Sequence, residues 1–152
     1  MKSCCFIADS IGYGYLKPIQ NELKKIINTL LENGITVFRT GTDNDFADLV
    51  NEILEEVKIT HPEIEIYNDT LLNTGDIVDG HFKFKFSGIS ERNKYLVDTC
   101  DASVFFINNE YPVKEPLFFD QDCWLTENLL LYKYALHKSK MVFFMTKYKN
   151  DD

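Results

Sequence analysis

The sequence predicts an α/β fold: a three-layer sandwich in which a mainly parallel sheet carries helices on both faces. Short apolar runs typical of buried strands alternate along the chain with longer segments whose apolar residues recur at helical spacing. No internal repeat, linker or second domain is visible in this alternation. A chain of 152 residues is long enough for one domain with one buried core.

The first elements are bounded by glycine and proline. Residues 4–9 predict a short buried strand, followed by a loop that contains Gly12 and Gly14. Pro18 should open a helix at its first position, where the missing N–H of proline costs no hydrogen bond. Apolar residues then recur at helical spacing until Gly34 ends the pattern.

A tight turn separates the second strand from the second helix. Residues 35–40 predict the strand, and apolar residues at helical spacing from Phe46 to Val57 predict the helix, with acidic residues on its other face. Residues 63–67 predict a third strand. Nucleotide-binding folds place a glycine-rich phosphate loop at a turn of this kind. Here the turn carries one glycine and two aspartates.

The second half of the chain continues the alternation. Residues 68–80 predict a loop, and residues 81–86 alternate strictly between polar and apolar, as a strand does. Ser90 should cap a helix over residues 91–99, and residues 102–108 predict another buried strand.

A helix over residues 124–140 and a strand over residues 141–147 complete the predicted order. We expect residues 1–147 to form the single domain and residues 148–152 to be a disordered acidic tail. Ligands of such sheets bind at the carboxyl ends of the strands, near the point where the strand order reverses. The loops that follow the strands are therefore the candidate site.

Composition argues against several classes of function. An apolar fraction of 45% and a charged fraction of 26% are ordinary for a globular protein. No apolar run approaches the roughly 18–20 residues that span a membrane, so we expect a cytoplasmic protein that does not enter one. The net charge of −8 disfavours nucleic acid as a partner. The densest lysines, at 133–140, are interpreted as complementing a helix dipole.

Cysteine and histidine do not predict a metal site. None of the four cysteines lies in a Cys-x-x-Cys pair, and the adjacent Cys4 and Cys5 should point to opposite faces of a strand. We interpret the cysteines as reduced and mostly buried thiols. The three histidines are scattered, so no convergent metal ligands can be named, and we expect no cofactor.

Three stretches together resemble one protein family. Residues 4–10 resemble a first strand that is usually Cys-Cys-Phe-Thr-Gly-His-Arg. Residues 38–66 resemble Phe-Ile-Thr-Gly-Gly-Ala-x-Gly-Phe-Asp, followed by a helix, Lys, Pro and an apolar strand. Residues 92–107 begin Arg-Asn-Lys-Tyr-Leu-Val-Asp and resemble Arg-Asn-Arg-Tyr-Met-Val-Asp before a buried strand. In this order they are similar to the YpsA-like branch of the SLOG superfamily, which is related to the DprA and LOG (lysine-decarboxylase-like) proteins.

The resemblance implies a Rossmann-like fold and a nucleotide-derived ligand. Some LOG proteins cleave the N-glycosidic bond of nucleoside monophosphates, and other superfamily members sense nucleotide signals in bacterial defence. From the resemblance and the predicted loops, the expected binding residues are Ala8, Asp9, Ser10, Tyr13, Thr40, Gly41, Thr42, Asp43, Phe46, Arg92, Asn93, Asn108, Thr126, Glu127 and Asn128.

The chain departs from the family at its glycines. Residues 7–9 replace the family's Thr-Gly-His, and residues 41–47 replace Gly-Gly-Ala-x-Gly-Phe-Asp with Gly-Thr-Asp-Asn-Asp-Phe-Ala. The family's Gly-Gly-Thr before the last helix aligns with residues 126–128, where both glycines are lost again. Glycine lets the backbone approach phosphate oxygens closely, so each loss adds a Cβ atom where phosphate would lie.

Asp43 and Asp45 also bring negative charge to the start of a helix. Two unit charges about 4 Å apart repel by roughly 4 kcal/mol at a surface-like dielectric. We interpret the turn as a degenerate or remodelled phosphate loop. The two aspartates either cap the helix or accept hydrogen bonds from ribose hydroxyls or a base edge. Calcium binding is disfavoured because the other loop ligands and the turn glycine are absent.

The remaining candidates each have a structural alternative. Arg92 and Asn93, at a helix N-terminus, either bind an anion or order the site by pairing with a loop acid. Asp98 is interpreted as a structural anchor. Tyr13 and Tyr15 either stack on a base or lie on the core.

Three functions follow from these patterns. The first is a non-catalytic binding protein, a sensor or decoy for a nucleotide-derived molecule, for which a phage or mobile-element origin would fit. The second is a LOG-like N-glycosidase, which is expected to need Pro-Gly-Gly-x-Gly-Thr-x-x-Glu. In this chain Leu129 takes the place of that glutamate, three residues after Thr126. The third is a ligand-free module that binds a protein partner, with a homodimer among the options.

Overall fold

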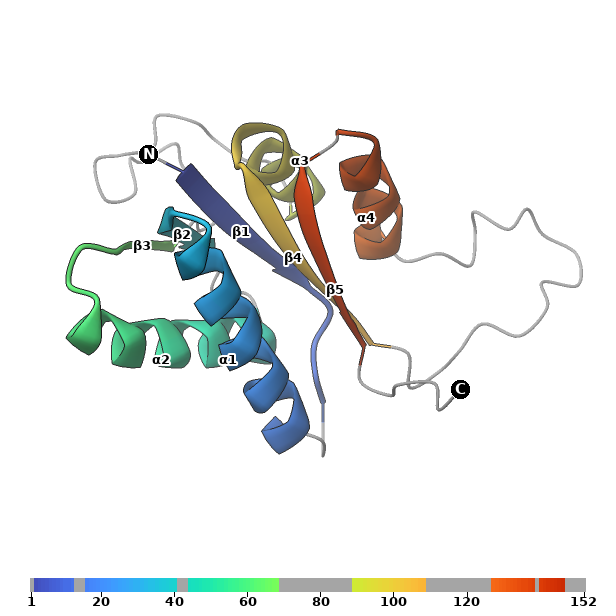
Figure 1. Ribbon diagram of the computed structural model, residues 1–152. Helices are drawn as coiled ribbons and strands as arrows, with labels where there is room; N and C mark the ends of the chain where they lie inside the picture. The colour runs from blue at the N-terminus through green and yellow to red at the C-terminus, as the bar shows by residue number, and fades with distance from the viewer. Residues whose placement is uncertain are drawn as a thin grey trace, which may run out of the picture.

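Parallel strands form one sheet at the centre of the computed structural model (Figure 1). The structure describes residues 2–12, 16–40, 44–68, 89–108, 127–138 and 140–146. Within these residues the sheet has five strands in the order β3-β2-β1-β4-β5, and every adjacent pair is parallel. The strands are β1 (Lys2–Ala8), β2 (Ile35–Thr40), β3 (Glu65–Asn68), β4 (Ala102–Ile107) and β5 (Met141–Thr146).

The strand order reverses between β1 and β4. The chain moves outward from β1 through β2 to β3, then returns to the other side of β1 and continues from β4 to β5. Strand β1 is paired along both sides, and its last residue, Ala8, is in register with Phe106 of β4. In a sheet of this kind the crevice for a ligand lies beyond the carboxyl ends of these two central strands.

Helices cover both faces of the sheet, which confirms the predicted α/β sandwich (Figure 1). Helices α1 (Leu16–Glu32) and α2 (Asp45–Thr60) pack on one face, and α3 (Ile89–Thr99) and α4 (Glu127–His137) pack on the other. In each strand–helix–strand unit the helix runs back from the carboxyl edge of the sheet. All four helix N-termini are therefore brought to the edge where the strands end.

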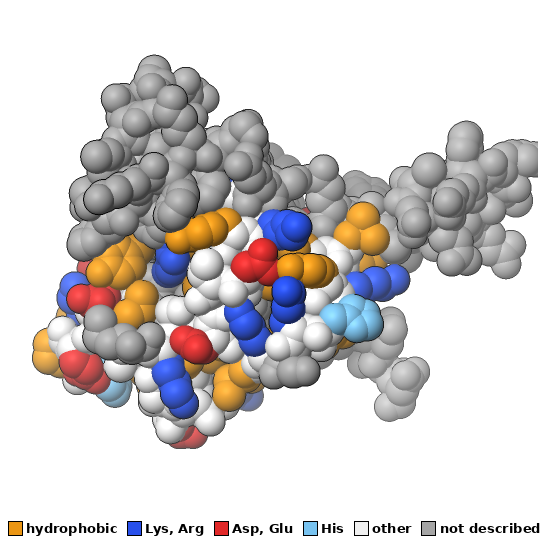
Figure 2. Space-filling model, turned by 90° about the horizontal axis from the view of Figure 1, so that it is seen from above, with side chains coloured by type: hydrophobic (Ala, Val, Ile, Leu, Met, Phe, Trp, Pro, Cys, Tyr) orange, Lys and Arg blue, Asp and Glu red, His pale blue; other side chains and the backbone are white. Residues whose placement is uncertain are grey.

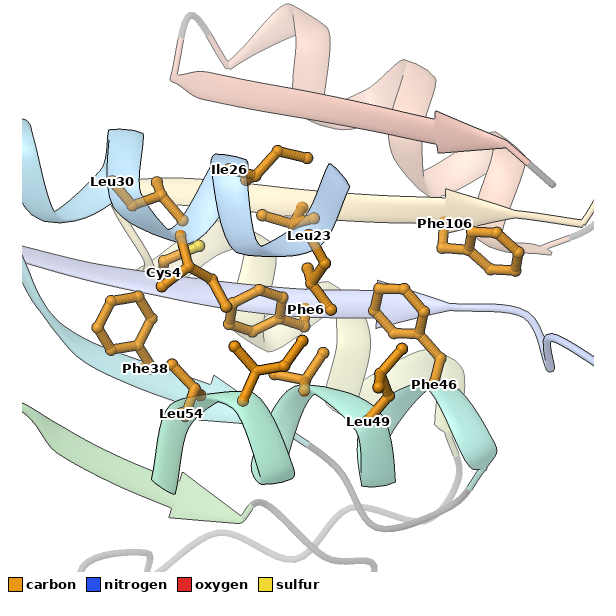
Figure 3. Close-up of a cluster of buried hydrophobic side chains, with 14 of the residues drawn as sticks. Cys4, Phe6, Leu23, Ile26, Leu30, Phe38, Phe46, Leu49, Leu54 and Phe106 are labelled. Carbon is orange, nitrogen blue, oxygen red and sulfur yellow. The ribbon is translucent and has the colours of Figure 1, made fainter. Parts of the chain in front are cut away.

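The larger apolar core lies between the sheet and the first two helices. Phe6 of β1 and Phe38 of β2 point toward Leu23 of α1 and Leu54 of α2, as Figure 3 shows. The amphipathic spacing seen in the sequence selects these contacts, since the buried residues of both helices recur every three or four positions. Burying each such side chain contributes about 1.5–3 kcal/mol.

The second core layer lies under α3 and α4 and contains two thiols. Cys4 belongs to the first layer, whereas Cys5 and Cys100 belong to the second, which confirms that the adjacent cysteines face opposite sides of β1. All three are free and buried. Burial raises the pKa of the Cys4 thiol, and a hydrogen bond to Cys100 together with burial raises the pKa of Cys5. These thiols stay protonated and serve as packing.

Two helix starts differ from the prediction. Helix α1 begins at Leu16, so Pro18 is its third residue instead of its first. Proline is tolerated there because the first four N–H groups of a helix have no partner inside the helix. Helix α3 begins at Ile89, so Ser90 lies within its first turn and does not precede it.

Several predictions fall on residues that the structure does not describe. These are the strand at 81–86, the start of the last helix at 124–126, Cys123 and the tail at 148–152. In the part of the chain that is described, no helix is long and apolar enough to cross a membrane.

Candidate functional site

Asp9 joins three segments at the crevice between β1 and β4. Its own N–H donates to the Phe106 carbonyl at 2.9 Å, which extends the pairing of the two strands by one residue. Its carboxylate accepts the backbone N–H of Asn108 at 2.9 Å and the side-chain amide of Asn128 at 2.8 Å. A single side chain thus connects the end of β1, the end of β4 and the first turn of α4.

Asn108 completes the bridge from the other side. Its side-chain amide donates to the carbonyl of Ser10 at 2.9 Å and approaches the carbonyl of Ile11 at 3.4 Å. The loop after β1 is therefore held against the end of β4 by hydrogen bonds in both directions. The point where the strand order reverses is occupied by the protein's own polar groups.

Asp45, the first residue of α2, holds the next part of the same loop. One carboxylate oxygen accepts the N–H of Ile11 at 2.7 Å, and the other accepts the N–H of Gly12 at 3.0 Å. Gly12 has φ +77°, a left-handed conformation that glycine adopts at little cost. Successive N–H groups that point the same way form an anion-binding nest, and here the anion is the Asp45 side chain.

Asn44 is the N-cap of α2. Its side-chain oxygen accepts the N–H of Ala47 at 3.0 Å, and its amide donates to the carbonyl of Ala8 at 2.8 Å. The interpretation of Asp45 as a cap is therefore wrong, because its carboxylate is turned to the loop after β1 while its neighbour caps the helix. The sequence alone does not distinguish Asn44 as the cap, because Asp43, Asn44 and Asp45 all precede the apolar pattern and are all good capping residues.

Carboxylates and amides gather at the carboxyl ends of β1 and β4. The hydrogen bonds above gather Asp9, Asp45, Asn44, Asn108 and Asn128 around the loop after β1. Amide and carboxylate groups suit hydroxyls, ring nitrogens and amino groups as partners, whereas a second anion would meet two negative charges. Among the described residues, no three His, Cys, Asp or Glu side chains converge as metal ligands.

Two of the predicted binding residues lie in the interior. Thr40 is fully buried, and its hydroxyl lies 2.9 Å from the Asn51 side-chain oxygen and 2.7 Å from that of Asn68. Phe46 is 1% exposed and stacks on Phe106 with 5.2 Å between ring centroids. Thr40 connects β2 with α2 and β3, and Phe46 anchors the start of α2 under the crevice.

Arg92 and Asn93 are also buried, in the first turns of α3. Each is 3% exposed, and the Arg92 guanidinium donates to the Asn93 side-chain oxygen from Nε at 3.1 Å and from Nη2 at 2.8 Å. Burying a charge is costly without such partners, so this contact helps to hold the guanidinium inside the protein. Their predicted role in binding a ligand stays a prediction.

Asp98 ties α3 to α4. It accepts the Tyr134 hydroxyl at 2.5 Å and lies 3.8 Å from the Lys138 ammonium, which agrees with its interpretation as a structural anchor. Lys140 donates to the carbonyls of Val97 and Asp98 at 2.9 and 2.7 Å, so it complements the end of α3. On the face seen from above in Figure 2, Lys and Arg side chains gather among hydrophobic ones.

The other predicted site residues cannot be placed. Tyr13, Gly41, Thr42, Asp43 and Thr126 lie outside the described residues, and only the backbone of Glu127 is described, as the first residue of α4. Of the predicted set, the hydrogen bonds bring together Ala8, Asp9, Ser10, Asn108 and Asn128. Asn44 and the role of Asp45 at the β1 loop were missed.

Comparison with protein-family models, with curated proteins and with solved structures finds no match to this chain.

Proposed function

We propose that the protein is a non-catalytic, SLOG-like binding protein for a nucleotide-derived small molecule, recognised through uncharged sugar or base groups. The observation that carries this proposal is the Asp45 carboxylate on the N–H groups of Ile11 and Gly12. A phosphate-binding relative would present such N–H groups to its ligand. In this chain they are already paired with a negative side chain.

Charge supports the same conclusion. A phosphate at the N–H groups of Ile11 and Gly12 would have to displace the Asp45 carboxylate from the nest. Repulsion of roughly 4 kcal/mol between unit charges about 4 Å apart corresponds to about a thousandfold loss of affinity. A ribose hydroxyl or a base edge brings no charge and could use the carboxylate and amide groups around it.

The absence of a catalytic acid in register favours binding over turnover. Leu129 takes the place of the glutamate that the LOG motif requires. Asp9, at the carboxyl end of β1, already accepts hydrogen bonds from Asn108 and Asn128, and so it is a poor general base. Binding without turnover fits a cytoplasmic sensor or decoy encoded by a phage or mobile element. Such a protein would act through a partner protein or a second copy of the chain.

A ligand screen by thermal shift tests the proposal. Nucleosides, their monophosphates, cyclic nucleotides and ADP-ribose derivatives are added to the purified protein. A ligand at a hundredfold excess over its Kd raises stability by about 2.7 kcal/mol. We expect a nucleoside to stabilise the protein more than its monophosphate does.

Two variants and one assay make the screen decisive. Asn128→Ala should weaken the effect of the ligand, whereas Asn21→Ala, an exposed change on α1, should leave it unchanged. Stronger binding of the monophosphate would contradict the proposed selectivity. Release of free base from a nucleoside monophosphate would restore the glycosidase hypothesis, and no shift with any compound would favour the ligand-free protein-binding module.

A further inference from the structure

Two adjoining cavities lie between α1 and α2. Each has a volume of about 330 Å³, and both are lined by Asn28 of α1. One runs along residues 53–60 of α2, and the other reaches Ile35, the first residue of β2. We call the two cavities together the α1–α2 groove. It extends to the amino ends of the strands, whereas Asp9 and Asn108 lie at their carboxyl ends, so the groove is separate from the crevice.

The groove meets the apolar core along its length. Ile35 and Ile53 are buried in that core, and Leu31 and Val57 are half-buried at its margin. Ile59 lines the same groove but is 81% exposed, the largest value for a large apolar side chain among the described residues. A branched apolar side chain left in water beside a hollow with apolar walls is a suitable anchor point for a partner.

Carboxylates surround these apolar side chains. Glu56 lines the first cavity, and Glu32 and Glu63 line the second. Within the described residues, none of the three carboxylates has an ion pair or a hydrogen bond. Lys24 is the only lysine or arginine among the described residues that line the groove. The groove therefore combines an apolar surface with a net negative charge.

The acidic charge continues along α2. Asp48, Glu52 and Glu56 are exposed and follow each other at intervals of four, so they form one row that ends in the groove. Like charges at this spacing destabilise a helix, and Glu56 also lies near the negative end of the helix dipole. Where a sequence breaks a local rule and the chain itself supplies no compensation, a functional contact is the expected reason.

We propose that the α1–α2 groove binds an amphipathic helix of a partner protein, with an apolar side chain against Ile59 and lysine or arginine beside the glutamates. On α1 the groove extends from Lys24 to Leu31, two helical turns or about 10 Å. That length accepts two apolar side chains placed one turn apart on a bound helix, the usual form of helix-in-groove recognition. The inference does not depend on the proposed function, because it uses no residue of the crevice.

Charge selects the kind of partner. A basic helix is attracted both by the net charge of −8 and by the three glutamates that lack a partner in the groove. An acidic helix or a second copy of this chain would be repelled by the same charges. The apolar side chains supply contact area, and the glutamates decide which amphipathic helices can use it.

The test uses a labelled peptide of about 15 residues that has leucines at helical spacing and lysines at the other positions. The full chain is titrated into it, and binding is followed by fluorescence anisotropy. A second peptide with glutamate in place of lysine serves as its control. We expect only the lysine peptide to bind, and to bind less tightly as salt increases. In NMR spectra of the full chain, the shifted amide signals should be confined to residues 24–36 and 53–63.

Matched variants separate the groove from general charge. Ile59→Ala should weaken binding of the lysine peptide by about fivefold or more, and Leu136→Ala, an exposed change on α4, should not. Glu56→Gln should also weaken binding, whereas Glu55→Gln should have less effect, because Glu55 is exposed on α2 but does not line the groove. All four side chains are exposed, so every variant should fold.

Three results would overturn the proposal. One is the absence of binding by the lysine peptide at near-millimolar concentration. The second is an equal loss of affinity for Glu55→Gln and Glu56→Gln together with no loss for Ile59→Ala, because the peptide would then follow only the net charge. The third is a dimer of the full chain that Ile59→Ala dissociates, as measured by sedimentation equilibrium, since it would assign the groove to a second copy.

Discussion

The crevice between β1 and β4 and the apolar core beneath it hold the same segments together by different physics. At the crevice, Asp9 and Asp45 each accept two hydrogen bonds from groups that are remote in sequence. In the core, the contacts of side chains such as Phe38 and Leu54 have no required direction. A directional network fails when one partner is lost, whereas an apolar core loses stability in proportion to the volume removed.

Phe46 and Asp45 are adjacent in sequence, but Phe46 belongs to the apolar core and Asp45 to the polar network. Phe46 is 1% exposed and stacks on Phe106, whereas Asp45 is exposed and holds the loop after β1. Helix α2 therefore starts at the boundary between core and crevice. The core fixes where the helix lies, and its first residue, Asp45, holds the loop after β1.

The largest expected effect comes from the core side of that boundary. Phe46→Ala should lower the free energy of unfolding by about 3–5 kcal/mol, because it leaves a cavity against Phe106. Denaturant unfolding measures this, and Phe46→Leu, which fills most of the space, should lose clearly less. A small loss for Phe46→Ala would show that the ring contributes little to packing and would favour its predicted role as a ligand contact.

A smaller loss should follow from breaking the network at Asp9. Asp9→Ala leaves the Asn108 N–H and the Asn128 amide without their acceptor and should cost about 1–3 kcal/mol. Glu55→Ala, an exposed change on α2 that removes the same charge, should stay within about 0.5 kcal/mol. Equal losses of unfolding free energy for the two variants would mean that the hydrogen bonds of Asp9 contribute nothing measurable to stability.

The core was predictable from the sequence because its signal is periodic. Apolar residues at helical spacing marked the buried sides of α1 and α2, and the adjacent Cys4 and Cys5 were correctly placed on opposite faces of β1. Such patterns survive errors of one or two residues in where an element begins. The shifted starts of α1 and α3 therefore left the predicted architecture intact.

The crevice was predictable only in part. Parallel strands end at one edge of a sheet, so Asp9 and Asn108 could be expected to lie near each other. The partner of Asp45 could not, because it consists of two backbone N–H groups whose direction depends on the left-handed conformation of Gly12. Asn44 could not be singled out as the cap of α2, because it lies between two aspartates and all three side chains are good helix caps.

The smallest expected change in stability, and the sharpest test of the comparison, is Asp45→Asn. Asparagine keeps one oxygen to accept the Ile11 N–H and removes the charge, and the N–H of the exposed Gly12 can bond to water instead, so the free energy of unfolding should fall by less than about 1 kcal/mol. Affinity for a nucleoside monophosphate should rise, and the rise should be larger at low salt, where screening is weaker.

Asp48→Asn is the matched control for this substitution. It removes one negative charge from the same first turn of α2, and Asp48 is exposed, as Asp45 is. If only the net charge matters, both variants should bind the nucleoside monophosphate more tightly by the same factor, as measured by titration. A gain confined to Asp45→Asn would assign the exclusion of phosphate to the carboxylate in the nest. No gain at any salt concentration would mean that the Cβ atoms added by the lost glycines already close the loop to phosphate.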